Sequence, residues 1–169
     1  MKRIYTASFL VLLMSIACQS QTVNKWEKWR WLIGTWKGEG SGKPGQGEGT
    51  FTFSLDLDQH VIVRKNHAEY GAGDNTPKGV HEDLMIIYPA PGTKSSKAIY
   101  FDNEGHVIEY QVSFSDSSIV FTSDRTDNMP AFRLTYEPLG NNTADVKFEM
   151  SQDGENFTTY LDGKSHKLK

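Results

Sequence analysis

A regular alternation of apolar and polar residues runs through most of the chain from residue 51 onward. A period of two is typical of strands that bury one face, because successive side chains of a strand point to opposite sides of the sheet. Runs such as Asp102-Asn103-Glu104-Gly105 and Gly140-Asn141-Asn142 separate these segments, as hairpin loops do. The pattern predicts strands near residues 35–42, 47–57, 60–70, 80–88, 97–102, 106–115, 118–125, 131–138, 144–151 and 156–162.

About ten strands are too many for one flat sheet, whose edges would also leave backbone donors and acceptors unpaired. Successive hairpins avoid both problems when they close into a barrel. We therefore expect an all-β fold, a single antiparallel up-and-down β-barrel of about ten strands. The one helical pattern lies in residues 23–32, where Trp26 and Trp29 are three residues apart, and it predicts a short N-terminal helix that caps the barrel.

The start of the chain has the layout of a signal peptide, because Lys2 and Arg3 precede an apolar stretch over residues 7–17. At about 1.5 Å per residue, such a helix is too short for a hydrocarbon core of about 30 Å, so a permanent membrane span is not expected. The stretch ends in Ser15-Ile16-Ala17-Cys18, which resembles a bacterial lipobox, and Cys18 is the only cysteine.

We expect Cys18 to become the lipidated first residue of an exported envelope protein, held in the periplasm or at the outer membrane by its acyl chains. The alternative is a secreted protein in which Cys18 is an incidental thiol in a tail. The predicted organisation is a signal peptide over 1–17, a tether over 18–25 and one barrel domain over 26–169.

The charge balance argues against a nucleic-acid partner. The chain has 18 basic and 21 acidic residues, and loss of Lys2 and Arg3 with a signal peptide lowers the formal charge from −3 to about −5. The basic residues are scattered singly among acidic ones, so no stretch of them can follow a phosphate backbone.

Strand parity predicts which side chains line the interior. In the predicted strand 144–151, Val146, Phe148 and Met150 share one face and charged residues share the other. The same reasoning turns a largely aromatic set inward: Trp36, Phe51, Phe53, Leu55, Ile108, Tyr110, Val112, Phe114, Ile119, Phe121, Phe132, Leu134, Tyr136, Phe157 and Leu161. Such a lining either fills the barrel solidly or surrounds a pocket for a small apolar or amphipathic ligand.

The predicted capping helix leads into Leu32-Ile33-Gly34-Thr35-Trp36-Lys37-Gly38-Glu39-Gly40. This opening resembles that of the calycin superfamily, in particular nitrobindin-like proteins and an uncharacterised lipocalin-like family of bacterial lipoproteins. The resemblance extends over residues 26–161 through Gly105-His106-Val107-Ile108 and Phe132-Arg133-Leu134. It implies a barrel whose floor is closed by Trp36 and which usually contains a ligand cavity.

The resemblance also implies alternatives to simple ligand binding. Nitrobindins bind haem through a histidine near the C-terminus, and His166 is the nearest candidate here. Because the basic ending His166-Lys167-Leu168-Lys169 offers few apolar residues for a haem pocket, no cofactor is expected and haem is the alternative. An enzyme of the isomerase or peroxynitrite-scavenging kind, and a structural envelope lipoprotein without ligand, are the others.

Arg125 follows Phe121 and Ser123 on the inward face of its predicted strand, where a cation needs a partner. Two roles remain open for it. It either packs as a clamp on a carboxylate, a carbonyl or the Trp36 indole, or it anchors the acidic head of a ligand. The predicted ligand-binding residues are Trp36, Phe53, His106, Tyr110, Phe121, Arg125 and Phe148.

The remaining motifs indicate no particular chemistry. Gly40-x-Gly42-x-x-Gly45 matches a dinucleotide fingerprint only in its letters, because no helix follows it. His81 and Asp83 share a strand face and offer two metal ligands, with His67 or Glu69 as a third, but ordinary surface residues are the favoured interpretation and no metal site is predicted. No set of catalytic residues is predicted either.

Overall fold

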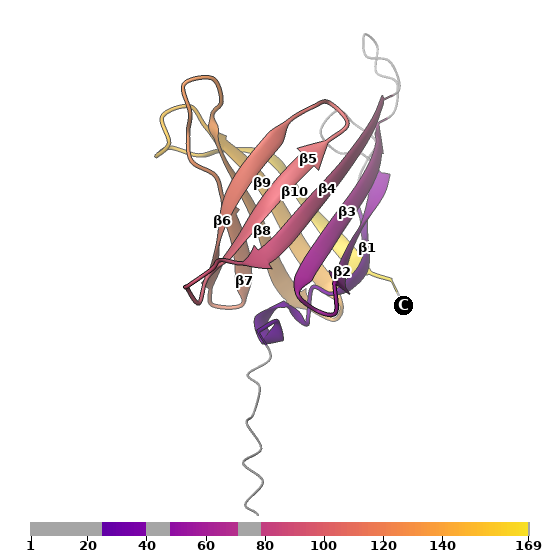
Figure 1. The fold of residues 1–169 in the computed structure, drawn as a ribbon. Coiled ribbons are helices and arrows are strands. Elements are labelled where there is room, and N and C mark those ends of the chain that lie inside the picture. Colours follow the sequence, from indigo (N-terminus) through magenta and orange to yellow (C-terminus); the bar gives the residue numbers. More distant parts are fainter. Residues whose placement is uncertain (1–24, 40–47, 71–78, 169) are drawn as a thin grey trace, which may run out of the picture.

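The computed structural model describes residues 25–39, 48–70 and 79–168, which form one closed barrel (Figure 1). Each strand pairs antiparallel with the next along the chain, and the first closes the ring by pairing with the last. The predicted all-β, ten-stranded, up-and-down barrel is therefore confirmed. The strands are β1 (Gly34–Gly38), β2 (Glu48–Asp56), β3 (Val61–Tyr70), β4 (Gly79–Pro89), β5 (Ser96–Asp102), β6 (Val107–Ser115), β7 (Ser118–Thr122), β8 (Ala131–Gly140), β9 (Thr143–Ser151) and β10 (Thr158–Lys167).

Some sequence predictions concern segments beyond these ranges. The predicted signal peptide, Cys18 and all but the last residue of the tether lie outside the described residues. Within the described ranges, no helix has the length and apolar character needed to span a bilayer. The strand limits differ most at β1, which ends at Gly38 rather than residue 42, at β7, which ends at Thr122 rather than residue 125, and at β10, which continues to Lys167 rather than ending at residue 162.

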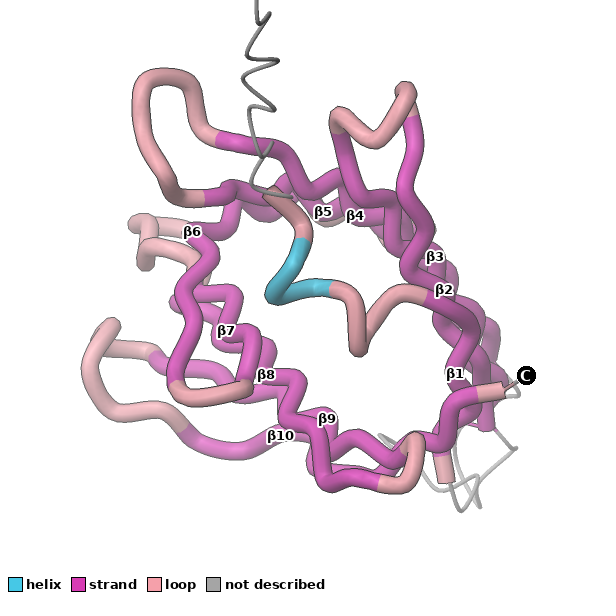
Figure 2. The backbone as a smooth tube through the Cα atoms, turned by 90° about the horizontal axis from the view of Figure 1, so that it is seen from below, coloured by secondary structure: helices cyan, strands magenta, loops and turns pink. Residues whose placement is uncertain are grey.

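The N-terminal cap is shorter than predicted. In the described part of the chain the only helical element is a single 3-10 turn, η1 (Glu27–Trp29), in place of a helix over 23–32. Trp26, Trp29 and Leu32 are three residues apart and all buried, which matches the three-residue period of a 3-10 turn. The segment lies across one end of the barrel and acts as the predicted cap (Figure 2). We call this the closed end, and the opposite end the far end.

Aromatic packing fixes the closed end. Trp29 meets Phe114 and Phe121 edge-on, each at 5.8 Å between ring centroids. The Trp36 indole N–H donates to the Leu32 carbonyl at 2.8 Å, and its ring stacks on Phe51 at 6.1 Å. Such pairs add to the free energy gained by burying the rings themselves. The floor of the barrel is thus a packed aromatic core.

Lys167 locks this floor from β10. Its ammonium donates to the Trp31 carbonyl at 2.7 Å and lies 5.3 Å from the centroid of the Trp36 ring. The cation that packs on the Trp36 indole is therefore Lys167, in the clamp role considered for Arg125.

Most of the predicted inward set faces the interior, with two exceptions. Leu55 is 40% exposed beyond the core, near the end of β2. Phe157 lies outside the barrel, because its ring packs on the Arg133 guanidinium at 4.1 Å and Arg133 alternates with the inward Leu134. A register shift between Thr159 and Leu161 breaks the alternation that the sequence suggested for β10.

Burial of the inward side chains changes along the barrel axis. Toward the closed end they are buried, as for Ile62, Ile87 and Ile119. Toward the far end they are only partly buried, as for Asn66 and His81. The interior is therefore a solid core at one end and accessible to solvent at the other.

Candidate functional site at the far end of the barrel

A buried ion pair joins β3 and β4 inside the barrel. The Arg64 side chain is 9% exposed and the Asp83 side chain 3%, and a guanidinium N–H of Arg64 donates to Asp83 Oδ1. The side-chain amide of Asn66 donates to Asp83 Oδ2 at 3.0 Å. Strand register brings the three together, because Asn66 pairs directly with Asp83 across the ladder.

The pair keeps a cation inside an aromatic barrel. Burial disfavours the charged form, but the Asp83 carboxylate, together with smaller contributions from Tyr136 and Tyr100, outweighs it and raises the pKa of Arg64 above its ordinary value. The guanidinium also lies 5.8 Å from the centroid of the Phe51 ring. Arg64 is therefore held in place by a counter-ion on one side and an aromatic face on the other.

Two buried polar atoms beside this pair have no hydrogen-bond partner of good geometry among the described residues: Nε of Arg64 and the hydroxyl of Tyr136. The Tyr136 hydroxyl nevertheless lies close enough to the Arg64 guanidinium to interact with it. Burial raises the pKa of Tyr136 to about 12, so its hydroxyl remains a neutral donor. Unsatisfied buried donors are rare, and a water or a ligand acceptor would satisfy these two.

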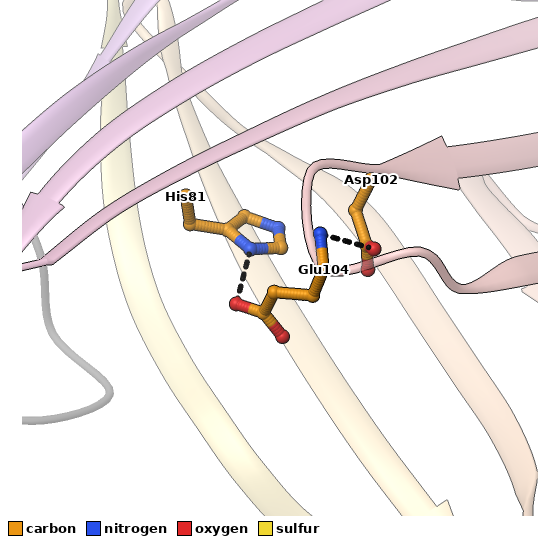
Figure 3. A group of neighbouring side chains, drawn as sticks. All are labelled: His81, Asp102 and Glu104. Atoms are coloured by element: carbon orange, nitrogen blue, oxygen red, sulfur yellow. Dashed lines mark hydrogen bonds and ion pairs between the residues drawn. The ribbon is translucent and has the colours of Figure 1, made fainter.

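A second polar group, the rim cluster, lies toward the far end and consists of His81, Tyr100, Asp102, Glu104 and His106. His81 comes from the start of β4, Tyr100 and Asp102 from the end of β5, and Glu104 and His106 from the β5–β6 loop. Figure 3 draws His81, Asp102 and Glu104. The ladder aligns these elements, since Asp83 pairs with Asp102 and Met85 with Tyr100.

The rim cluster is a continuous set of hydrogen bonds. His81 Nδ1 lies 3.3 Å from Glu104 Oε1, and its Nε2 lies 3.1 Å from the Tyr100 hydroxyl and 3.4 Å from Asp83 Oδ2. The Tyr100 hydroxyl donates to Asp102 Oδ2 at 3.2 Å. His106 Nδ1 lies 2.9 Å from the same oxygen. Through Asp83, the rim cluster continues into the buried ion pair.

Asp102 is the best-anchored member of the rim cluster. Its Oδ1 accepts the backbone N–H groups of Glu104 at 3.0 Å and His106 at 2.9 Å, which shapes the β5–β6 turn around it. Burial opposes its charge, but the backbone and side-chain hydrogen bonds from His106 lower the pKa of Asp102 below its ordinary value. Asp102 is thus an ionised carboxylate fixed in one orientation.

Two further pKa shifts follow from this network. The hydrogen bond to Asp83 raises the pKa of His81, even though burial acts in the opposite direction. Burial, together with the Asp83 and Asp102 charges, raises the pKa of Tyr100 far above that of a free phenol. Tyr100 therefore remains a neutral donor at any physiological pH.

The wall opposite the rim cluster is apolar. β4 and β9 lie on opposite sides of the ring of strands. Phe148 on β9 stacks on Phe132 of β8 at 5.7 Å, and the Tyr160 ring meets Phe148 edge-on at 6.2 Å. Both phenylalanines are only partly buried, so solvent reaches apolar rings inside the barrel.

The predicted ligand-binding residues are distributed between the two ends. Trp36, Phe53 and Phe121 belong to the packed core, and Tyr110 is buried against Phe121 at 6.1 Å. Phe148 lies in the apolar wall and His106 in the rim cluster. Arg125 lies apart from both: β7 ends before it, so the inward alternation does not extend to it, and its side chain is exposed in the β7–β8 loop.

The histidines considered for metal or haem occupy different faces. His67 lies on the outer face with Glu69 and Glu82, so neither His67 nor Glu69 meets His81 and Asp83 inside. His166 is also on the outer face, where it contacts Glu39 and lies 3.3 Å from the Thr143 hydroxyl. A haem inside the barrel would not reach His166, so this residue does not fit the role that the resemblance implies.

Sequence reasoning missed Arg64, Asp102 and Glu104. Arg64 lies in Val61-Ile62-Val63-Arg64, where both faces of the strand are apolar and parity does not identify the inner one. The position of Asp102 could have been predicted from the register of the β4–β5 hairpin, because a hairpin in which Pro89 pairs with Ser96 also pairs Asp83 with Asp102. The signal was therefore the hairpin register and not a motif.

A shallow hollow also lies on the outside of the barrel, over β2 to β5. It is lined mainly by outward residues that alternate with the interior set, among them Thr52, Lys65, His67, Leu84 and Phe101. Asn66, Asp83 and Asp102 also border it, but the ion pair of Asp83 with Arg64 faces the interior, and the other lining residues are ordinary surface side chains.

Comparisons with models of known protein families and with curated protein sequences found no match for this chain.

Proposed function

We propose that this protein is a small-molecule-binding barrel whose ligand is amphipathic and lies at the far end. The observation that carries the proposal is the contrast between opposite walls of the interior. Phe132 and Phe148 offer partly exposed apolar rings on one side, and His81 and Tyr100 offer partly exposed polar groups on the other. A molecule with one apolar and one polar side matches both walls.

A ligand that covers the apolar wall gains free energy, because the partly exposed rings of this wall are otherwise in contact with water. Covering a partly exposed aromatic ring yields about 25 cal/mol for each Å² of apolar surface removed from water. The packed closed end supports the same location, because its side chains already fill the space between the strands there.

The polar wall supplies orientation. Arg64 Nε is a buried donor without an acceptor among the described residues, and the neighbouring Tyr136 hydroxyl, which interacts with the Arg64 guanidinium, keeps its own proton to donate; both lie next to the ion pair beneath the rim cluster. A carboxylate, carbonyl or hydroxyl oxygen of the ligand would satisfy such donors. The resemblance of the Gly34-Thr35-Trp36 opening to ligand-binding calycins supports the same class of function.

We propose the envelope as the place of action, with the barrel anchored by acyl chains on Cys18. The support is the apolar stretch before Cys18 and its lipobox-like ending. In such an arrangement the barrel samples amphipathic molecules next to the membrane, where they are concentrated.

Fluorescence titration with dansyl-labelled undecanoic acid tests the proposed function. Phe148→Ala should weaken binding at least about tenfold, because losing an aromatic contact surface costs about 1.5–3 kcal/mol. Phe101→Ala, in the outer hollow, is the matched control and should leave the affinity unchanged. Equal effects of the two substitutions, or no saturable binding by the wild type, would overturn the proposal.

A further inference from the structure

The rim cluster contains the ligand types of a transition-metal site. Among the described residues, His81, Asp102 and Glu104 each place one potential ligand atom within 4.8 Å of the others (Figure 3). His106 adds a fourth, because its Nδ1 lies 2.9 Å from Asp102 Oδ2 and 3.8 Å from Glu104 Oε2. Two imidazoles with two carboxylates suit Zn²⁺ better than Ca²⁺ or Mg²⁺, which prefer oxygen ligands alone.

We propose that the rim cluster binds one Zn²⁺ ion through His81 Nδ1, Asp102 Oδ2, Glu104 Oε1 and His106 Nδ1. In a tetrahedral site with bonds of about 2.0–2.1 Å, neighbouring ligand atoms are about 3.3 Å apart. The separation of His81 Nδ1 from Glu104 Oε1 is 3.3 Å, and that of His106 Nδ1 from Asp102 Oδ2 is 2.9 Å. His106 Nδ1 also lies 3.8 Å from Oε2, the second carboxylate oxygen of Glu104.

Three of the four ligands need only a small contraction. Two ligand atoms of one zinc ion cannot be more than about 4.2 Å apart, so His81, Asp102 and Glu104, whose ligand atoms lie within 4.8 Å of one another, must close by at most about half an ångström. Glu104 can provide this movement, because its side chain is 59% exposed and sits in a loop. Asp102 stays fixed by the backbone amides of Glu104 and His106, which hold its other oxygen.

Contacts with residues outside the proposed ligand set orient His81 for zinc binding. With Nδ1 facing Glu104, His81 presents Nε2 to the Asp83 carboxylate at 3.4 Å and to the Tyr100 hydroxyl at 3.1 Å. A proton on Nε2 would be donated to Asp83, and the lone pair would then be on Nδ1. Metal-bound histidines commonly show this arrangement, in which a carboxylate accepts from the second ring nitrogen. Arg64 and Asn66 in turn fix Asp83.

The outer face provides a natural comparison. His67 lies 3.1 Å from Glu82 and 3.5 Å from Glu69, so it too has a histidine between carboxylates. It differs in that no buried carboxylate anchors the group: all three side chains are about half exposed or more. The assignment of zinc to the rim cluster depends on the anchored Asp102 and does not rest on the proposed amphipathic ligand.

Isothermal titration of metal-stripped, untagged protein with ZnCl₂ tests the inference, with Cys18→Ser as the background so that the thiol does not bind zinc. One zinc per chain is expected, and His81→Ala should lower the affinity at least about 100-fold. His106→Ala should also weaken binding, and its exposed position should leave the fold intact. Tyr100→Phe, which removes a contact outside the ligand set, should cost about tenfold.

His67→Ala is the matched control and should leave zinc binding unchanged. Co²⁺ should give the intense visible absorption of a four-coordinate site, and His81→Ala or His106→Ala should abolish it. Circular dichroism of each variant distinguishes loss of the site from loss of the fold, and His81→Asn replaces His81→Ala if the latter unfolds. Absence of stoichiometric binding, or equal losses in His67→Ala and His106→Ala, would overturn the inference.

Discussion

The buried Arg64–Asp83 pair predicts a large and specific loss of stability when one partner is neutralised. Asp83→Asn keeps the shape of the side chain but leaves the Arg64 cation without a counter-ion in the interior. The side chains are 9% and 3% exposed, so solvent screens their interaction only weakly. Breaking a pair of this kind costs about 3–5 kcal/mol, and we expect Asp83→Asn to lower the free energy of unfolding by that amount.

The assay is urea denaturation at neutral pH in the presence of a chelator, read by tryptophan fluorescence from the packed closed end. A double-mutant cycle with Arg64→Met separates the pair from its surroundings. The double variant Arg64→Met/Asp83→Asn should be much more stable than the sum of the single losses predicts, because no unpaired charge remains.

The exposed pair Arg30–Glu27 is the matched control. Its side chains are 70% and 62% exposed at a separation of 3.2 Å, so Glu27→Gln should change stability by less than about 1 kcal/mol. If Asp83→Asn costs no more than Glu27→Gln, or if the cycle shows no coupling, Arg64 is not held in the interior as described.

Three further predictions concern the cap, an outer ion pair and processing. Trp36→Ala should cost about 3–5 kcal/mol, because its buried indole stacks on Phe51 and binds the Leu32 carbonyl; a loss under about 1 kcal/mol in the same denaturation assay would contradict the packed floor. The hydrogen bonds from Arg133 lower the pKa of Glu149, so this pair should contribute up to about 1 kcal/mol above the ordinary carboxyl pKa, a contribution lost as pH falls through the lowered value. The free energy of unfolding of Glu149→Gln, measured against pH, should lack this dependence. The same decline at acidic pH in Glu149→Gln and the wild type would refute the contribution of the pair. Expressed in a diderm bacterium, the wild type should fractionate with membranes and Cys18→Ala should not; an unmodified thiol in soluble wild-type protein would leave simple secretion.

The fold was predictable because its determinants are local. Alternation and turn residues locate each strand, and hairpins of similar length leave a closed barrel as the way to pair every edge. The cap was predicted in position but not in form, since the spacing of Trp26 and Trp29 fits a 3-10 turn as well as an α-helix. Parity identified Phe53, Phe121 and Tyr136 correctly as interior residues.

The site was less predictable because it depends on register between strands. Arg125 was assigned inward by extending the alternation three residues past the end of β7, and a strand end is not visible in a polar stretch. Arg64, the cation that does lie inside, is followed by Lys65, and either one fits the interior until pairing with β4 decides. His81 meets Glu104 only because two consecutive hairpins are in register, which no single-strand pattern contains.

Mapping of amide chemical-shift changes during titration with dansyl-labelled undecanoic acid tests the central claim most directly. The account predicts saturable changes along the two walls of the far end, around Phe132 and Phe148 and around His81 and Tyr100, with little change at the Trp29 and Trp36 floor. Changes confined to Thr52, Leu84 and Phe101 on the outer face, or no saturable change anywhere, would contradict a ligand site inside the barrel.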